Sequence, residues 1–382
     1  LYRLDFDQDE SEWQIVQSPF AGDSPSVLYG YDNRYVCALD TAGRFLRYDT
    51  RDGEIIEHQL DSYGQMDTHC LCVVRQIGKA FGGPYINQRF WKIDLETGNG
   101  RDLGRAAPGG GQICCMVWDE ATARLIMASY TTCTVTAFDP DAPAAWPDNP
   151  RVLAVIGHEQ MRPMDMVHDG RYVWLASSPQ YGHLGGALSR IDPKSGEVRL
   201  WRHLIPDEKP NSLVLDKSSR LLYVGMEIYA DGNSTPATQK TAKLVAFDID
   251  NLEIRYQQNI RDDATALRVL AMLPSGKVLI LDGTEGFTWH IRMGTLWTWD
   301  PRDGTIENLG QVSENLGDVA IGPDGHIYAA YGKNICTLAV DDTKVSFKPI
   351  LATGNQQGQF LQIRNGTLYY VLGNELRAMP LD

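Results

Sequence analysis

The chain has 382 residues, 43% of them hydrophobic and 22% charged, which is an ordinary globular composition with enough apolar side chains for a large core. Its formal charge is −14, from 49 acidic and 35 basic residues, and this argues against a nucleic-acid partner, which usually requires a basic excess or a basic stripe. No apolar run approaches the roughly 18 residues of a membrane-spanning helix, so no membrane partner is expected.

An outer hairpin recurs along the chain: an apolar strand that ends in an acidic residue, a turn, and a second strand. The copies are residues 45–49, 90–94, 135–140, 188–193, 244–248 and 296–301, with weaker copies at 336–341 and 376–380. Their spacing of about 40–56 residues is the period of a four-stranded propeller blade.

A second strand pair lies upstream of each outer hairpin. The fourth copy shows it best, with residues 164–168, the turn Asp169-Gly170, and residues 172–176. Asp-Gly between alternating apolar runs is a strong hairpin signal, and no segment has convincing helical periodicity. We therefore predict an all-β chain that forms a single β-propeller domain over residues 1–382, built from four-stranded antiparallel blades.

The repeats fit eight blades best, and seven is the alternative if one weak copy belongs to a neighbouring blade. The last copy supplies three strands, and the N-terminal run Trp13–Val16 can supply the fourth. Closing the ring with strands from both termini removes exposed sheet edges.

The surroundings of the seven cysteines indicate whether the protein lies in a reducing or an oxidising compartment. Most lie in apolar, strand-like runs such as residues 34–39, where a reduced cysteine acts as a small hydrophobe. Reduced thiols favour a cytoplasmic location. Because the chain begins at Leu1 without a methionine, secretion with a removed signal peptide is the alternative.

The loops of the predicted propeller differ between its two faces. The turns within the strand pairs are short, whereas the connections on the other face are long, irregular and rich in polar and aromatic residues. Function usually lies on such loops when a rigid scaffold carries them, so this face is the predicted site. Its candidate substrate-binding residues are His69, Tyr85, Arg89, Gln112, His158, Glu159, Gln160, Glu227, Trp289, His290 and Arg292.

This mixture of side chains suits a carbohydrate. Aromatic rings pack on the apolar face of a sugar ring, while amide and guanidinium groups bond its hydroxyls. Arginine adds a fork that fits a carboxylate in two hydrogen bonds. We therefore expect an acidic oligosaccharide as the partner.

Over nearly its full length the chain resembles the PQQ-like and WD-like β-propeller superfamily. The segments 159–163 (Glu-Gln-Met-Arg-Pro) and 181–188 (Tyr-Gly-His-Leu-Gly-Gly-Ala-Leu) look like a blade in bacterial propellers often found with carbohydrate-degrading enzymes. More distantly, the chain is similar to propeller polysaccharide lyases and rhamnose–glucuronate-cleaving enzymes, which use His, Tyr and Arg in a funnel on one face. The resemblance implies residue types and not positions.

A lyase that cleaves a uronic-acid-containing oligosaccharide by β-elimination needs three groups: one to neutralise the carboxylate, a base for the C5 proton, and an acid for the leaving oxygen. We predict Arg162 for the carboxylate, His183 as the base and Tyr181 as the acid, and the last two could exchange roles. Assisting or substitute groups on the same face are Arg89, Arg292, His69, His158 and His290.

Two other functions fit the same face. A glycoside hydrolase would place two carboxylates about 5–9.5 Å apart, and Glu159, Glu227 and Glu285 lie in the right loops. A non-catalytic propeller that binds glycans or proteins is the main alternative, because a fold does not decide a function.

No cofactor is predicted. The sequence has no His-x-His, Cys-x-x-Cys or His-Glu-x-x-His spacing, although ligands gathered from several blades would leave no local motif, so a divalent cation stays open. Cys114-Cys115 is the kind of vicinal pair that quinone dehydrogenases carry, but the glycine–tryptophan docking motif of their blades and any haem attachment sequence are missing.

Overall fold

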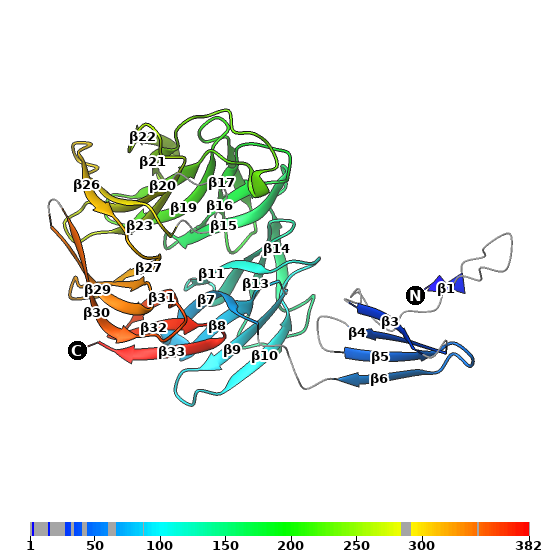
Figure 1. The fold of residues 1–382 in the computed structure, drawn as a ribbon. Coiled ribbons are helices and arrows are strands. Elements are labelled where there is room, and N and C mark those ends of the chain that lie inside the picture. The colour runs from blue at the N-terminus through cyan, green and yellow to red at the C-terminus, as the bar shows by residue number, and fades with distance from the viewer. Residues whose placement is uncertain are drawn as a thin grey trace. The chain divides into compact units, whose positions relative to one another are not determined.

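The computed structural model describes residues 2–3, 14–15, 27–31, 34–39, 44–59, 66–86, 88–283, 292–341 and 344–381. The chain forms two compact units, Leu1–Met66 and Asp67–Asp382. The described residues form β-strands (Figure 1), and the helices among them are two short 3-10 helices, η1 (Arg75–Ile77) and η2 (Asp231–Asn233). The predicted all-β class is thus confirmed. Within these ranges no helix is long and apolar enough to cross a bilayer.

The described residues of the smaller unit form one four-stranded sheet and one strand pair. The sheet is an antiparallel meander of β3 (Val27–Tyr31), β4 (Tyr35–Leu39), β5 (Arg44–Asp49) and β6 (Ile55–Gln59). The pair joins β1 (Tyr2–Arg3) to β2 (Gln14–Ile15). Because β2 pairs with β1, the predicted use of the run 13–16 as a closing strand is not confirmed.

The larger unit contains seven consecutive groups of antiparallel strands, which Figure 1 shows in order from cyan to red. The first three are β7 (Thr68–Val74), β8 (Lys79–Pro84), β9 (Arg89–Asp94) and β10 (Gly100–Arg105); β11 (Ile113–Asp119), β12 (Arg124–Ser129), β13 (Thr134–Phe138) and β14 (Arg151–Val155); and β15 (Gln160–His168), β16 (Val173–Pro179), β17 (Ala187–Ile191) and β18 (Val198–Arg202). The fourth and fifth are β19 (Lys209–Asp216), β20 (Leu221–Glu227), β21 (Lys243–Asp248) and β22 (Glu253–Asn259); and β23 (Ala266–Met272), β24 (Val278–Gly283), β25 (Thr295–Trp299) and β26 (Ile306–Gln311). The last two are β27 (Leu316–Ile321), β28 (Ile327–Tyr331), β29 (Asn334–Val340) and β30 (Val345–Ala352); and β31 (Gln359–Arg364), β32 (Thr367–Leu372) and β33 (Glu375–Pro380).

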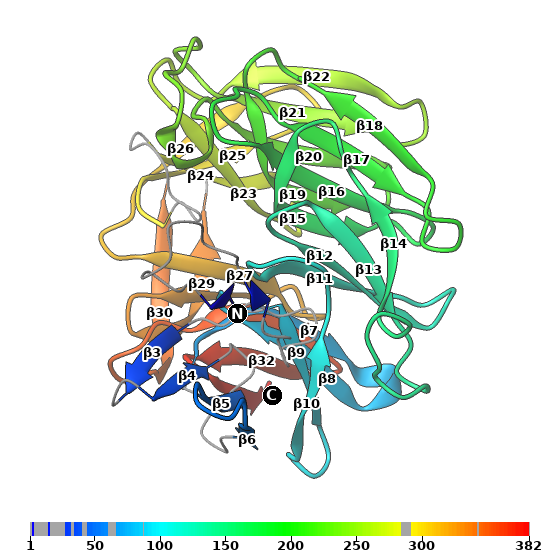
Figure 2. The same ribbon diagram turned by 90° about the vertical axis from the view of Figure 1, so that its right-hand side faces the viewer.

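Apolar layers between neighbouring groups form the core. The third and fourth groups, side by side in Figure 2, enclose Trp174 of β16, which stacks on Trp201 of β18 and meets Phe247 of β21 edge-on. Both ring-centroid distances from Trp174 are 5.7 Å. Such layers follow from strands whose middle residues are apolar on both faces, because each face then needs a neighbouring sheet.

The first and last groups of the larger unit are also in contact. Leu71 and Val73 of β7 share an apolar cluster with Tyr369 and Val371 of β32. The side chain of Gln362 fixes this contact, because its amide nitrogen donates to Leu71 O (2.7 Å) and its oxygen accepts from Val73 N (2.9 Å). Strands near the two ends of the larger unit are therefore in contact with each other.

The acidic residue that ends each predicted hairpin strand caps the following turn. Asp192 Oδ1 accepts hydrogen bonds from the backbone N–H groups of Lys194 (2.8 Å) and Ser195 (3.3 Å), and Asp248 Oδ1 does the same for Asp250 and Asn251. In the first of these turns Gly196 has a φ of 77°, which favours glycine. The acidic residue in the sequence repeat therefore marks a turn that recurs in the structure.

Four-stranded antiparallel sheets are confirmed, but the finer features of the predicted propeller are not. The predicted first hairpin, residues 45–49, falls in the smaller unit, and the last group, β31–β33, has three described strands. The count of eight blades and the ring closure by N- and C-terminal strands are not confirmed, and the single domain stays a prediction.

Candidate functional site

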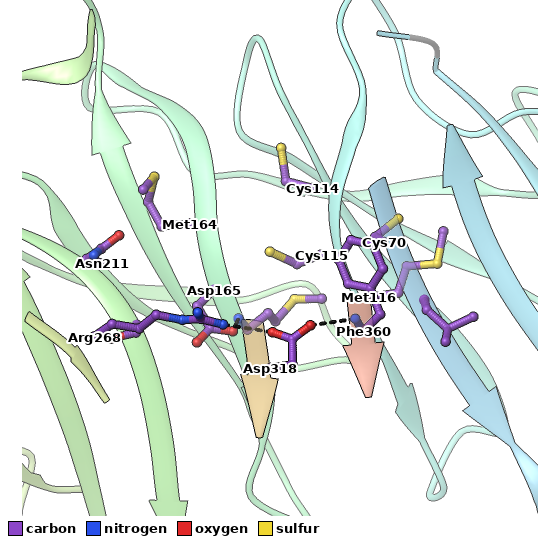
Figure 3. Close-up of a pocket in the computed structure, with 13 residues that line it drawn as sticks. Cys70, Cys114, Cys115, Met116, Met164, Asp165, Asn211, Arg268, Asp318 and Phe360 are labelled. Atoms are coloured by element: carbon purple, nitrogen blue, oxygen red, sulfur yellow. Dashed lines mark hydrogen bonds and ion pairs between the residues drawn. The ribbon is translucent and has the colours of Figure 1, made fainter. Parts of the chain in front are cut away.

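The first strands of all seven groups line one cavity of about 200 Å³ in the larger unit. Figure 3 shows its wall, to which the seven strands contribute Cys70, Cys115, Asp165, Asn211, Arg268, Asp318 and Phe360. Strands from every group can line one cavity only if they surround a common axis. We call this space the central channel.

An ion pair between neighbouring first strands lies in the wall of the central channel. Arg268 Nη2 lies 2.7 Å from Asp318 Oδ1, and Asp318 also accepts a hydrogen bond from Phe360 N. Burial raises the pKa of Asp165, which faces the same cavity, to about 6. The wall of the channel therefore carries ionisable groups at this position.

A buried arginine organises the end of the channel where the first strands begin and the second strands end. Arg162 of β15 pairs with Asp231 of η2 at 2.7 Å, and their side chains are only 3% and 1% exposed. The Arg162 guanidinium lies over the ring of Tyr130, 3.8 Å from its centroid. Its Nη2 donates to Tyr181 Oη (3.3 Å), and the Tyr130 and Tyr181 hydroxyls are 3.3 Å apart. We call these four residues the Arg162 cluster.

Three loops meet in the Arg162 cluster, because Tyr130 follows β12, Tyr181 follows β16 and Asp231 follows β20. The last two loops are bound to each other, since Gly182 N donates to Ser234 Oγ (2.8 Å). A Cβ atom on Gly232 would lie 3.0 Å from the Tyr181 ring, so the small residue allows this approach.

His69 of β7 is a histidine whose pKa responds to Arg162. Its half-buried ring packs against Tyr85, with 5.2 Å between the centroids. Burial, and secondly the positive charge of Arg162, lower the pKa of His69 to about 4. The imidazole is therefore neutral at pH 7.

The pKa of the Tyr130 phenol is shifted in the opposite direction to that of His69. Burial raises the pKa of Tyr130, and the hydrogen bond with Tyr181 raises it further. The hydroxyl therefore keeps its proton at neutral pH. The pKa values of His69 and Tyr130 both respond to the charge of Arg162.

Three of the predicted binding residues are buried. Glu227 is 2% exposed and its Oε1 is 3.4 Å from Lys209 Nζ, while burial raises its pKa. Gln160 accepts a hydrogen bond from Ser177 Oγ (2.8 Å), and Gln112 is buried as well. These three side chains are therefore buried and are not exposed binding groups.

The structure does not bring His183 into contact with Arg162. Its side chain is 45% exposed, and its Nδ1 lies 3.6 Å from Glu159 Oε2. The same carboxylate oxygen accepts a hydrogen bond from Arg202 Nη2 (2.9 Å). His183 and Glu159 therefore belong to an exposed ionic group at the rim.

The remaining predicted residues have other surroundings. Arg89 pairs with Asp102 of the neighbouring outer strand at 2.7 Å. Arg292 donates to Gln357 (2.9 Å), and burial lowers its pKa. His158 is exposed, with a φ of 49°. Trp289 and His290 lie outside the described residues.

In the part of the chain that the structure describes, no three or more His, Cys, Asp or Glu side chains converge as a metal site. Neither Asp231 nor a role for Tyr130 is predicted from the sequence. The signal for Asp231 was an acidic residue directly before glycine in a long loop, a pattern common to many turns.

The low pKa of His69 predicts a pH dependence of stability. Between its folded pKa of about 4 and its ordinary 6.5, the unfolded chain binds the proton that the folded chain excludes, so the free energy of unfolding falls as the pH falls. His69→Gln removes this contribution. We expect urea titrations at several pH values to give the variant a smaller loss over this window. His203→Gln, at an exposed histidine, should keep the wild-type slope, and an unchanged slope in His69→Gln would contradict the assignment.

No model of a known protein family and no curated protein matches the sequence. Solved structures do match. They include a chain in the crystal structure of a mitotic checkpoint complex (TM-score 0.61, 12% identity, 95% of this chain and 97% of that chain) and virginiamycin B lyase from Staphylococcus aureus (0.60, 9%, 82% and 94%). A third is the Cps50 (Swd1) β-propeller domain of Myceliophteria thermophila (0.55, 13%, 85% and 98%).

Identities this low show the fold alone. Because the third of these structures is a β-propeller domain, the predicted β-propeller fold is supported, whereas membership of the predicted superfamily stays a prediction. The predicted resemblance to carbohydrate-acting propellers has no support in these matches.

Proposed function

We propose that the Arg162 cluster and His69 form a catalytic site that cleaves acidic oligosaccharides by β-elimination. The observation that carries the proposal is that the pKa values of a neutral histidine and a protonated tyrosine both respond to the charge of one buried guanidinium, which lies over the tyrosine ring. An elimination needs both a base and an acid in these states at the same pH. A propeller neighbour named a lyase is compatible with this chemistry on the fold, although it shares 9% identity.

The burial of Arg162 changes the role that its sequence position suggests. Because Asp231 pairs with Arg162 and both side chains are buried, the guanidinium acts through the tyrosines that cover it. The hydroxyl of Tyr181, which is 52% exposed, donates to the substrate carboxylate. The charge of Arg162 behind it stabilises the anion that forms as the C5 proton leaves.

In the proposed reaction His69 takes the C5 proton, and the electrons of the C–H bond form the new C4–C5 double bond. The C4–O bond breaks, and Tyr130 gives its proton to the leaving oxygen. His69 and Tyr130 then exchange protons with solvent to restore the starting state. His69 thus replaces His183 as the base, whereas Tyr181 stays at the site as a binding group.

The closed Arg162–Asp231 ion pair also favours a second candidate, a glycan-binding site without cleavage. In that case the pair holds Tyr130 and Tyr181 as a rigid aromatic platform, and no proton transfer takes place. A hydrolase is less favoured, because Glu227 is buried against Lys209 and Glu285 lies outside the described residues.

The test is a panel of uronic-acid-containing glycans, with the ultraviolet absorbance of the unsaturated product as the readout. We expect His69→Gln and Tyr130→Phe each to lower kcat/KM by about 10²–10⁴-fold, the range for loss of a general base or acid. His183→Gln is the matched control and should lose much less.

Full turnover in His69→Gln would refute the assigned base. If no glycan is cleaved, binding of the same panel by calorimetry decides between the two candidates. Binding that Tyr181→Ala abolishes would support the platform, and no binding at all would exclude both.

A further inference from the structure

A buried glutamine of the first group binds the loop that carries Tyr130. Gln88 directly precedes β9 and is only 6% exposed. Its side-chain nitrogen donates hydrogen bonds to Gly110 O (3.0 Å) and to Tyr130 O. Gly110 lies before β11 and Tyr130 follows β12, so one side chain joins the loops at the two ends of this strand pair.

The neighbours of the Gln88 amide fix its orientation. Its NH₂ group has two N–H donors, and both contacts are carbonyl oxygens, which only accept hydrogen bonds. A flipped amide would place its own oxygen against these two oxygens. The contact therefore requires a side chain with two donors at this position.

The loop that contains Gly110 also contacts Tyr130 directly. The Tyr130 N–H donates to Gln112 O (2.9 Å). Gly111 has a φ of 104°, and a Cβ atom there would lie 2.5 Å from Tyr130 O and 2.8 Å from Tyr130 Cδ1. Glycine is therefore needed at position 111 both for its backbone conformation and for the close approach.

This loop is itself held by an arginine. Arg105 Nε donates to Ala107 O (2.8 Å), and its Nη2 donates to Gly109 O (2.7 Å). The guanidinium is a rigid fork of donors, so the two bonds fix the loop backbone next to Gly110. Gln88 thus ties the Tyr130 carbonyl to a loop that is already anchored.

The position of the Tyr130 ring matters because its contacts in the Arg162 cluster are short. The Arg162 guanidinium lies 3.8 Å from the ring centroid, and the Tyr181 hydroxyl lies 3.3 Å from the Tyr130 hydroxyl. A displacement of about 1 Å would weaken both contacts, and a misplacement of this size costs about 10²-fold in the rate of a reaction that depends on the group.

We propose that Gln88 is a positioning residue, which holds Tyr130 where its hydroxyl gives a proton to the leaving oxygen. The inference rests on the role of Tyr130 in the proposed function. Gln88 is buried, so it acts through Tyr130 and not on the substrate. Without its two hydrogen bonds, the Tyr130 backbone is released from the loop and the ring shifts away from Arg162 and Tyr181.

Two variants test this inference through different contacts with the same tyrosine. Gln88→Met keeps a long, unbranched side chain and removes both donors, whereas Gly111→Ala places a Cβ atom against the Tyr130 carbonyl and ring. The first readout is the pKa of Tyr130, measured by ¹³C NMR of the tyrosine Cζ atoms in the full chain. The signal of Tyr130 is the one that Tyr130→Phe lacks.

We expect both variants to lower the pKa of Tyr130 toward its ordinary 10.0, because burial and the Tyr181 hydrogen bond raise it in the wild type. The expected shift is about one pH unit. With a glycan that the wild type cleaves, we also expect kcat to fall about 10²-fold with little change in KM, because the substrate contacts themselves are kept.

The matched controls are a glycine and a glutamine without a side-chain contact to Tyr130. A Cβ atom on Gly110 would have no atom within 4 Å. Gln258 of β22 also donates to a carbonyl, Gly304 O (3.2 Å), but in the outer strands. Gly110→Ala and Gln258→Met should keep the wild-type pKa of Tyr130, and circular dichroism checks that every variant is folded.

A wild-type Tyr130 pKa in folded Gln88→Met and Gly111→Ala would overturn the inference. So would a shifted pKa with unchanged kcat, if Tyr130→Phe itself loses activity. Full turnover in Tyr130→Phe would instead refute the proposed acid, while the pKa shift would still show that Gln88 positions the ring. If the wild type cleaves no glycan, the pKa measurement alone decides whether Gln88 holds Tyr130 in place.

Discussion

Replacement of Arg162 by leucine is expected to lower the free energy of unfolding by about 3–5 kcal/mol, the usual cost of removing one partner of a buried ion pair. The reason is the burial of Asp231, whose side chain is 1% exposed and has Arg162 as its partner at 2.7 Å. Without the guanidinium, this carboxylate is left in a site of low polarity. Urea denaturation followed by fluorescence gives the change.

The matched control for this prediction is Arg89→Leu. Arg89 also pairs with an aspartate at 2.7 Å, but the side chains of Arg89 and Asp102 are 27% and 35% exposed, and exposed pairs contribute only about 0–1 kcal/mol. The double variant Arg162→Leu/Asp231→Leu should recover part of the loss, because it removes the isolated charge. If Arg162→Leu costs no more than Arg89→Leu, Asp231 is not the buried, charged group described above.

The second large effect is expected for Trp174→Ala, which should lower the free energy of unfolding by about 3–5 kcal/mol. Trp174 is fully buried between the third and fourth groups, and its removal leaves a cavity that Trp201 and Phe247 cannot fill without moving. The change also deprives the buried Asp169 carboxylate of the indole N–H that donates to it at 2.8 Å.

Trp174→Phe separates these two contributions. It keeps most of the apolar contact and loses the indole N–H, so we expect about 1–3 kcal/mol from the lost hydrogen bond to Asp169 together with the lost volume. Trp201→Ala is a control at a ring that is only partly buried, and its cost should be smaller. A loss below 1 kcal/mol in Trp174→Ala would contradict tight packing between these groups.

The strands could be predicted from the sequence because their signals are local. The predicted run 188–193 corresponds to β17 (Ala187–Ile191) and the turn after it, and the predicted run 164–168 lies within β15 (Gln160–His168). Alternation and the capping aspartate both act within a few residues. The division into two units is not local. The hairpin at residues 45–49 has the same sequence pattern as the other copies, so the pattern does not reveal that it belongs to a different unit.

The candidate site could be predicted only in part. The sequence assigns Arg162, Tyr181 and His69 to loops on one face. In the structure Arg162 and His69 lie near the starts of strands β15 and β7, and Arg162 and Tyr181 form a hydrogen bond. The partners could not be predicted, because contacts between groups depend on strand register and loop conformation. Asp231 is 69 residues from Arg162 along the chain, and His183, two residues from Tyr181, binds Glu159 at the rim instead.

The contact between Gln362 and β7 has a consequence for how the larger unit folds. Val73 and Gln362 are 289 residues apart, and joining the ends of such a loop costs about 5 kcal/mol of chain entropy in a flexible chain. Docking of β31 and β32 against β7 and β8 must offset that cost, which makes it a late step that waits for the intervening groups to assemble. The exchange of the Val73 amide hydrogen with solvent would then report on the opening of this junction.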